Sequence, residues 1–121
     1  MGEGVLIDTD VLIDYVKGRR SLPKLLCYIS EVTLYEFIRG TRDPGEAKTL
    51  LEREFAILYC NNAILETAAR VWRELKRRGS LVDDRDLIIG CTAIAKGLPL
   101  LTGNIEHFEK LKEFGLVFYR D

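Results

Sequence analysis

Short apolar runs alternate along the chain with longer segments in which apolar residues recur every three or four positions. Uninterrupted apolar runs are typical of buried strands, and amphipathic segments are typical of helices that cover a sheet. Ser, Asp, Asn or Pro stands at the start of the predicted helices and Gly follows several of them, as helix boundaries favour. The predicted strands are 5–7, 25–29, 55–59, 98–101 and 116–119, and the predicted helices are 11–17, 31–39, 44–54, 62–78, 84–96 and 105–112.

This alternation of strand and helix decides the expected fold class. Because parallel strands need helical crossovers, it predicts an α/β fold, a three-layer α/β/α sandwich with a central parallel sheet. With 121 residues the chain is long enough for one core and too short for two, so residues 1–121 are predicted to form a single domain. Trp72 and three cysteines, Cys27, Cys60 and Cys91, are expected in the core, the cysteines as reduced thiols.

Three acidic residues interrupt or border the apolar runs. Asp8 follows the first predicted strand, Glu36 lies inside the apolar segment 32–38, and Asp86 precedes three apolar residues. Ionised carboxylates are costly to bury without a partner, and a divalent cation shared by all three is the simplest one. Functional groups of parallel sheets gather beyond the carboxyl ends of the strands, where Asp8, Asp86 and Asn104 are all expected. The pattern therefore indicates a metal-dependent enzyme.

Composition narrows the class of enzyme. A formal net charge of −1 gives no global basic field, so a nucleic acid would have to be held by local basic patches. The single histidine, His107, excludes chemistry that needs two imidazoles. No run approaches the ~20 apolar residues that span a bilayer. Residues 1–4 show no secretory leader. A cytoplasmic protein without membrane contact is expected.

Four phrases occur in an order that resembles a known family. Together they resemble the PIN-domain ribonucleases, and among these the VapC toxins of bacterial and archaeal toxin–antitoxin pairs. One phrase alone is a weak signal, whereas four in order, within a resemblance from Val5 to about Val117, are specific. The phrases are Leu6-Ile7-Asp8-Thr9-Asp10, Val32-Thr33-Leu34-Tyr35-Glu36, Asp86-Leu87-Ile88-Ile89-Gly90-Cys91-Thr92-Ala93 and Leu98-Pro99-Leu100-Leu101-Thr102-Gly103-Asn104.

The resemblance implies an activity, a cofactor and partners. It implies endonucleolytic cleavage of RNA with Mg²⁺ or Mn²⁺, a homodimer, and a small VapB-like antitoxin that covers the site. Asp8, Glu36 and Asp86 fall on the family's three acids, and Asn104 falls on its fourth position, where Asp is also common. Asn at that position leaves three formal carboxylates, which is compatible with one metal instead of two.

The chemistry of the residues assigns provisional roles. Oxygen ligands suit hard Mg²⁺ or Mn²⁺, and such an ion can neutralise a phosphodiester and activate water. Asp8 and Asp86 are expected as direct ligands, Glu36 as a ligand or the residue that orients the attacking water, and Asn104 as a neutral ligand, a water-positioning group or a helix cap.

Four further residues are expected around the metal ligands. Asp10 is a candidate helix cap or a support for the ligands, and Thr102 either orients a neighbour or packs. Arg39 and Arg85, each close in sequence to an acid, are the preferred RNA contacts.

Three other functions share parts of this pattern. Asp8-Thr9-Asp10-Val11 also resembles the opening motif of haloacid dehalogenase-type phosphatases, although the chain is short for that fold. A PIN-like module that binds RNA or protein without cleavage is a second alternative, since a fold does not guarantee activity. A receiver-like phosphoacceptor is disfavoured, because the run from Phe55 to Cys60 ends without Asp. Metal-dependent cleavage of RNA is the leading hypothesis.

Overall fold

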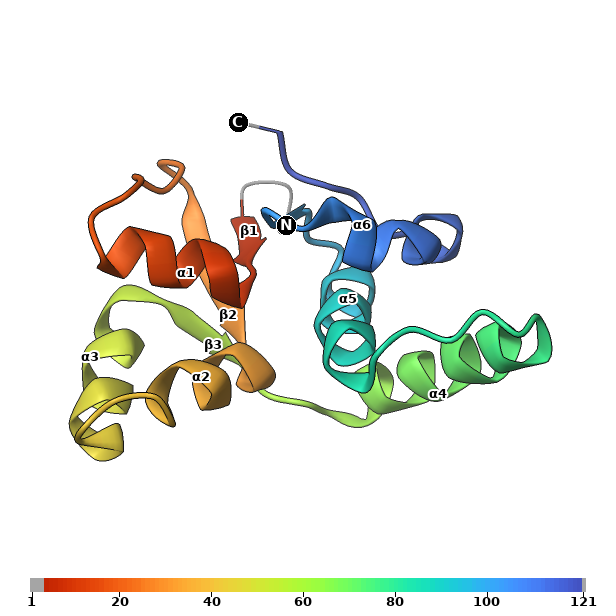
Figure 1. Cartoon of the computed structure of the whole chain (residues 1–121), viewed down its shortest axis with the longest axis horizontal. Coiled ribbons are helices and arrows are strands. Elements are labelled where there is room, and N and C mark those ends of the chain that lie inside the picture. Colours follow the sequence, from red (N-terminus) through yellow and green to blue (C-terminus); the bar gives the residue numbers. More distant parts are fainter. Residues whose placement is uncertain (1–3, 121) are drawn as a thin grey trace.

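The computed structural model describes residues 4–120, and strand and helix alternate along them (Figure 1). The predicted absence of a leader concerns mainly residues 1–3, which lie outside the described residues. The strands are β1 (Gly4–Ile7), β2 (Leu26–Ser30), β3 (Ala56–Leu58) and β4 (Leu100–Leu101). The helices are α1 (Thr9–Val16), α2 (Glu31–Ile38), α3 (Pro44–Glu54), α4 (Asn62–Arg77), α5 (Asp84–Lys96) and α6 (Ile105–Phe108), followed by a 3₁₀ helix, η1 (Glu109–Phe114).

The four strands form one parallel sheet in the order β3-β2-β1-β4. Successive residues of a strand point to opposite faces, and β1 follows this rule. Leu6 packs with residues of α4, α5 and α6 in one hydrophobic cluster, while Val5 and Ile7 pack with residues of α1, α2 and α3 in the other. Figure 1 shows the two groups of helices on opposite sides of the sheet. The predicted three-layer α/β/α fold with a central parallel sheet is confirmed.

Side-chain caps fix where several helices begin. The Asp8 carboxylate accepts a hydrogen bond from Thr9 N, and Ser30 Oγ accepts one from Thr33 N at 3.1 Å. Such caps satisfy backbone N–H groups that the first turn leaves without partners. Since Asp8 and Ser30 directly follow or end β1 and β2, α1 and α2 both begin at the carboxyl edge of the sheet.

Four predictions about local structure were wrong or only partly right. The last strand, 116–119, is a single parallel bridge between Leu100 and Phe118, because β4 is only two residues long. The helix 105–112 divides into α6 and η1. Trp72 is 37% exposed, with Lys76 Nζ 4.9 Å from the centre of its ring, and is not a core residue. Cys60 is half-buried, whereas Cys27 and Cys91 are buried as predicted.

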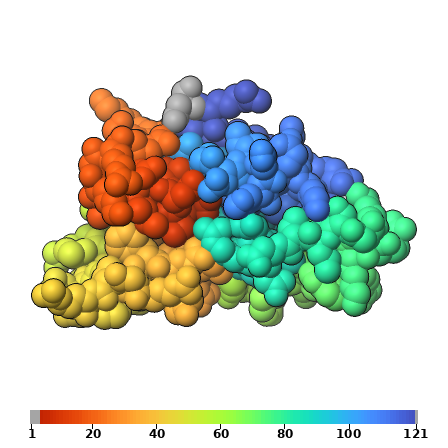
Figure 2. Space-filling view, in the orientation of Figure 1, coloured from red at the N-terminus to blue at the C-terminus, as the bar shows by residue number. Residues whose placement is uncertain are grey.

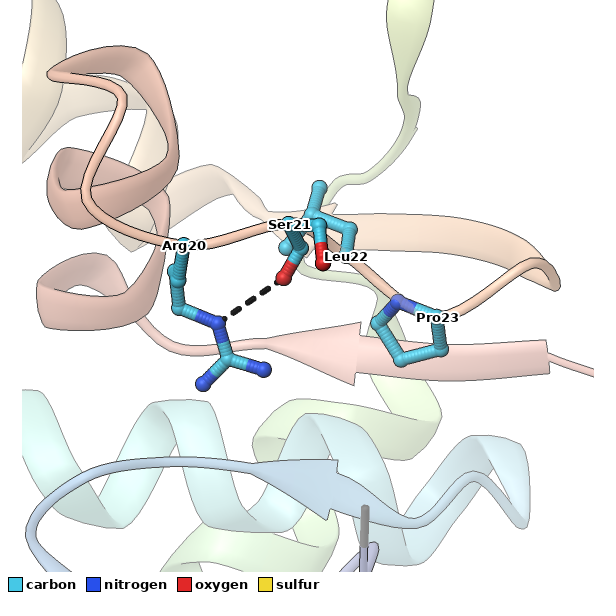
Figure 3. A pocket seen from close by; sticks show the side chains of 4 residues that line it. All are labelled: Arg20, Ser21, Leu22 and Pro23. Atoms are coloured by element: carbon cyan, nitrogen blue, oxygen red, sulfur yellow. Dashed lines mark hydrogen bonds between the residues drawn. The ribbon is translucent and has the colours of Figure 1, made fainter.

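The connection from α1 to β2 forms a pocket near the amino end of β2. Arg20, Ser21, Leu22 and Pro23 line it, and Arg20 Nε donates a hydrogen bond to Ser21 O at 3.0 Å (Figure 3). This connection enters the amino end of β2, so the pocket does not belong to the carboxyl edge where α1 and α2 begin. Within residues 4–120, no helix has the length and apolar character needed to cross a membrane.

Candidate active site

The carboxyl edge of the sheet brings together the three acids that the sequence singles out. Asp8 directly follows β1, and its backbone N–H donates to Leu101 O at 2.9 Å, which joins it to β4. Glu36 comes from α2 and Asp86 from the first turn of α5. Figure 2 shows the surfaces of α1 in red, α2 in orange, α5 in blue-green and the segment after β4 in blue meeting near the centre of one face. Three separate elements thus supply one acidic cluster.

Arg85 occupies the centre of this cluster. Its Nε donates to Glu36 Oε2 at 2.5 Å, its Nη1 donates to Asp86 Oδ1, and its Nη2 lies 3.3 Å from Asp8 Oδ1. Although burial opposes it, the hydrogen bond to Glu36 and the charges of the three carboxylates raise the pKa of the Arg85 guanidinium above its ordinary value. The residue predicted to contact RNA is therefore the internal counter-ion of the acids in this structure. Its contact with RNA stays a prediction.

Asp8 is the most deeply buried of the three acids, with 1% of its surface exposed. Thr9 N donates to Oδ1 at 2.8 Å and Thr102 Oγ1 donates to Oδ2 at 2.8 Å. Burial raises the pKa of the Asp8 carboxyl to about 6, and the neighbouring Asp10 adds to the rise, while the hydrogen bonds from Thr102 and Thr9 oppose it. An Asp8 carboxylate in this position needs positive charge beside it at neutral pH.

Two threonines orient Glu36. Thr9 Oγ1 donates to Glu36 Oε1 at 2.7 Å and also lies 2.9 Å from Thr33 Oγ1. Thr33 is fully buried, which places this pair of hydroxyls inside the protein. Sequence reasoning did not single out Thr9 or Thr33 for this task. The only available signal is that Thr9 lies between two candidate acids and that Thr33 lies three residues, about one helical turn, before Glu36.

Asp10 fastens the loop that follows β4. Its Oδ1 accepts from Val11 N at 2.9 Å, and its Oδ2 accepts from Gly103 N at 3.1 Å and Asn104 Nδ2 at 3.2 Å. A Cβ at Gly103 would lie 2.7 Å from Asp10 Oδ2, so any larger residue there would force the Asp10 carboxylate to shift. Asp10 therefore acts both near the helix start and as a support for the loop.

Asn104 lies beside Asp10, while the three clustered acids surround Arg85. The backbone N–H of Asn104 donates to Thr102 Oγ1 at 2.9 Å, and the Asn104 side chain makes no capping hydrogen bond to α6. Asn104 therefore occupies the N-cap position of α6 as predicted but does not cap the helix through its side chain, and a role for Asn104 as metal ligand or water-positioning group stays a prediction. Thr102, by contrast, orients two neighbours at once, since its hydroxyl joins Asn104 N to Asp8.

Two further candidate residues, His107 and Arg39, are exposed. Most of the His107 side chain is exposed, and its Nδ1 lies 3.7 Å from Asp86 Oδ2. The guanidinium of Arg39, the other predicted RNA contact, lies 5.1 Å from the centre of the Tyr35 ring on the exposed side of α2. Its role in binding RNA stays a prediction.

The donor set fits a hard divalent metal by its chemistry. Asp8, Glu36 and Asp86 offer carboxylate oxygens only, which Mg²⁺ and Mn²⁺ prefer, and they already surround one positive charge. With the guanidinium between them, no group of three acidic, His or Cys side chains among residues 4–120 is spaced to hold one ion. That Asp8, Glu36 and Asp86 hold a metal stays a prediction.

Replacement of Thr102 tests the support of Asp8. Thr102→Val keeps the shape but removes the donor to Asp8 Oδ2 and the acceptor for Asn104 N. We expect the free energy of unfolding at pH 7 to fall by about 1–3 kcal/mol, because a buried carboxylate loses a hydrogen bond. Urea denaturation measures it. Thr102→Ser keeps the hydroxyl and is the control, and equal stability of the Val and Ser variants would contradict the role.

Comparison with known proteins identifies the family of the chain. Residues 5–113 match the family described as PIN domain. The chain is 46% identical over 117 residues to Ribonuclease VapC1 of Methanocaldococcus jannaschii, an alignment that covers 95% of this chain and 86% of the relative. It is 31% identical over 116 residues to Ribonuclease VapC19 of Mycobacterium tuberculosis, covering 85% of this chain and 90% of the relative.

A solved structure shares the fold. DNA-bound VapBC from Salmonella typhimurium superposes with a TM-score of 0.80 at 23% identity, covering 98% of each chain. At that identity the likeness speaks for the fold alone. The family match over most of the chain and the 46% identity to a VapC ribonuclease carry the assignment further. The chain belongs to the PIN-domain family, in the group of the VapC proteins.

Proposed function

We propose that this protein is a metal-dependent endoribonuclease and the toxin of a VapBC-type toxin–antitoxin pair. The observation that carries the proposal is the gathering of Asp8, Glu36 and Asp86, from three separate elements, around one positive charge at the carboxyl edge of the sheet. Membership of a group whose named relatives are ribonucleases supports RNA as the substrate. PIN-domain VapC ribonucleases depend on metal as a class, and the oxygen donors favour Mg²⁺ or Mn²⁺ here.

The residues around the site divide the work of hydrolysis. A bound divalent ion would neutralise the phosphodiester and lower the pKa of a water molecule. Asp8 and Asp86 would hold that ion, and the hydrogen bonds of Thr102 and Thr9 N keep the Asp8 carboxylate in one orientation. Glu36, positioned by Thr9 Oγ1, would bind the ion or orient the attacking water. Asp10 and Thr102 together hold the loop with Asn104 at the rim.

Partners are proposed from the same relationship. Solved neighbours include a toxin–antitoxin complex from Klebsiella pneumoniae, which is 28% identical to this chain. A VapB-like antitoxin is therefore the proposed protein partner, and a homodimer acting on RNA in the cytoplasm is the proposed working form. The exposed apolar residues Leu65 and Trp72 of α4 support a protein partner, because they line a pocket with Leu87 and Ile88 of α5.

Cleavage of a labelled pool of cellular RNA, with EDTA, Mg²⁺ or Mn²⁺, tests the activity. We expect cleavage with either metal and none with EDTA. In Asp86→Asn the cleavage rate should fall at least about 100-fold, because removal of a residue that only supports a metal ligand already lowers activity by about 10–100-fold. Glu66→Gln is the matched control, since Glu66 is an exposed acid of α4 that pairs with Arg70 at 3.6 Å.

Two results would contradict the proposal. Cleavage that persists in EDTA or in Asp86→Asn would place the activity elsewhere. Absence of both cleavage and metal binding in the unaltered protein would instead favour the alternative of a PIN-like module that binds without cutting.

A further inference from the structure

The guanidinium of Arg85 contacts all three acids through three different nitrogens. Nε pairs with Glu36, Nη1 with Asp86, and Nη2 with Asp8. The outer faces of the acids have other partners, since Thr9 Oγ1 donates to Glu36 Oε1, Thr102 Oγ1 donates to Asp8 Oδ2, and His107 lies near Asp86 Oδ2. Arg85 therefore contacts one oxygen of each acid, Glu36 Oε2, Asp86 Oδ1 and Asp8 Oδ1, and shares only the last of these with another donor, Thr9 N.

A divalent metal and the guanidinium cannot bind these oxygens together. Hard divalent ions bind carboxylate oxygens at about 2.0–2.6 Å. A guanidinium that lies between the acids, at hydrogen-bond distance from each, holds their oxygens farther apart than that. Two positive groups within about 4 Å would also repel each other in a partly buried site. The Arg85 side chain can move toward solvent, because 30% of it is exposed, compared with 14% for Glu36 and 10% for Asp86.

We propose that Arg85 is a built-in competitor of the catalytic metal, a counter-ion that neutralises the acids of the metal-free protein and must be displaced before the metal binds. This inference rests on the proposed function, because it requires a metal at the three acids. The measured metal affinity then includes the cost of displacing Arg85, which lowers it. A displaced guanidinium next to the metal would also be free to contact phosphate, the role that the sequence predicted for it.

A competitor of the metal and a purely structural arginine predict different effects of an Arg85 substitution on stability and metal affinity. Without the guanidinium, three carboxylates repel one another, so an Arg85 variant should lose stability in EDTA. The same variant should gain more from metal than the unaltered protein does, because nothing has to be displaced. A purely structural arginine would lower stability with and without metal alike and would leave the metal affinity unchanged or weaker.

Calorimetric titration with Mn²⁺ and thermal unfolding in EDTA or Mn²⁺ test the competition. We expect Arg85→Gln to bind Mn²⁺ at least about 10-fold more tightly than the unaltered protein, the factor that about 1.4 kcal/mol of displacement cost would produce. It should also melt lower in EDTA and show a larger rise in melting temperature with Mn²⁺. Arg70→Gln removes the same charge from an exposed position of α4 and should leave the Mn²⁺ affinity unchanged.

Equal or weaker Mn²⁺ affinity in Arg85→Gln would overturn the inference. If the unaltered protein then still cleaves RNA with metal, only the inference has failed. If neither protein binds Mn²⁺ and no RNA is cleaved, the proposed function has failed as well.

A measurement on the unaltered protein covers the case in which Arg85→Gln does not fold. The Nε–H signal of Arg85 in a proton–nitrogen correlation spectrum, assigned through Arg85→Lys, should shift or broaden when Mg²⁺ is added. A signal that stays unchanged at saturating Mg²⁺ would also overturn the inference.

Discussion

Asp8→Asn is expected to abolish RNA cleavage and to raise the free energy of unfolding at pH 7. Burial raises the folded-state pKa of Asp8 from 3.8 to about 6, so the folded protein holds this proton more tightly than the unfolded chain does. The stability that Asp8 contributes is therefore fully present below pH 3.8 and is lost as the pH rises through about 6. Asparagine has the same shape and no charge, so it avoids that loss.

The size of the gain follows from the same shift. At about 1.4 kcal/mol per pKa unit, the rise from 3.8 to about 6 allows about 3 kcal/mol at neutral pH. Loss of the contact with Arg85 offsets part of it. We expect a net gain of about 1 kcal/mol in EDTA at pH 7 and no gain near pH 4. The loss of cleavage should exceed about 100-fold, since Asp8 is a proposed metal ligand.

Urea denaturation at pH 7 and pH 4, beside the cleavage assay, checks both parts. Asp14→Asn is the matched control, because Asp14 is a carboxylate of α1, the helix that Asp8 caps, and faces Arg19 at the surface. It should change stability by no more than about 0.5 kcal/mol and leave cleavage intact. An Asp8→Asn protein that unfolds more easily at pH 7 would show instead that the carboxylate is required for the fold.

The gathering of the acids was predictable because it depends on backbone topology. Asp8 follows a strand, and Asp86 begins a helix. In a parallel sheet such positions share an edge, whatever the details of the side chains. The place of Arg85 was not predictable in the same way. A long side chain can turn toward the acids or toward solvent, and its position one residue before Asp86 does not decide between them.

The errors in local structure have similar physical causes. Trp72 follows Val71 on α4, and the buried face of that helix passes through Ala68, Val71 and Leu75, which leaves Trp72 at the rim of the stripe. The final apolar segment, 116–119, pairs with β4 at one residue only, because β4 has only two residues. The length of β4 cannot be predicted from the sequence of the segment that pairs with it. The short polar bonds of Thr9 and Thr33 likewise depend on contacts between α1 and α2.

Phe108→Ala is expected to cause a large loss of stability. Phe108 ends α6, is fully buried, and belongs to the cluster that packs against one face of the sheet. A Cβ placed on Gly90 of α5 would overlap Leu111 Cδ1 of η1 and would lie 3.7 Å, an ordinary van der Waals distance, from Phe108 Cδ1, so both segments pack directly on α5. Truncation of a buried phenylalanine costs about 3–5 kcal/mol. For a domain of this size, we expect the melting temperature to fall by roughly 12–20 °C.

Thermal unfolding of Phe108→Ala beside Ile105→Ala isolates the effect of burial, because Ile105 is an exposed apolar residue of the same short helix. Ile105→Ala should lower the stability by no more than about 0.5 kcal/mol. Below its own melting temperature, Phe108→Ala should keep its affinity for Mn²⁺, because Asp8, Glu36 and Asp86 come from other elements. A Phe108→Ala protein as stable as Ile105→Ala would contradict the packing of α6. A folded Phe108→Ala protein without Mn²⁺ binding would show that the packing of α6 shapes the proposed metal site.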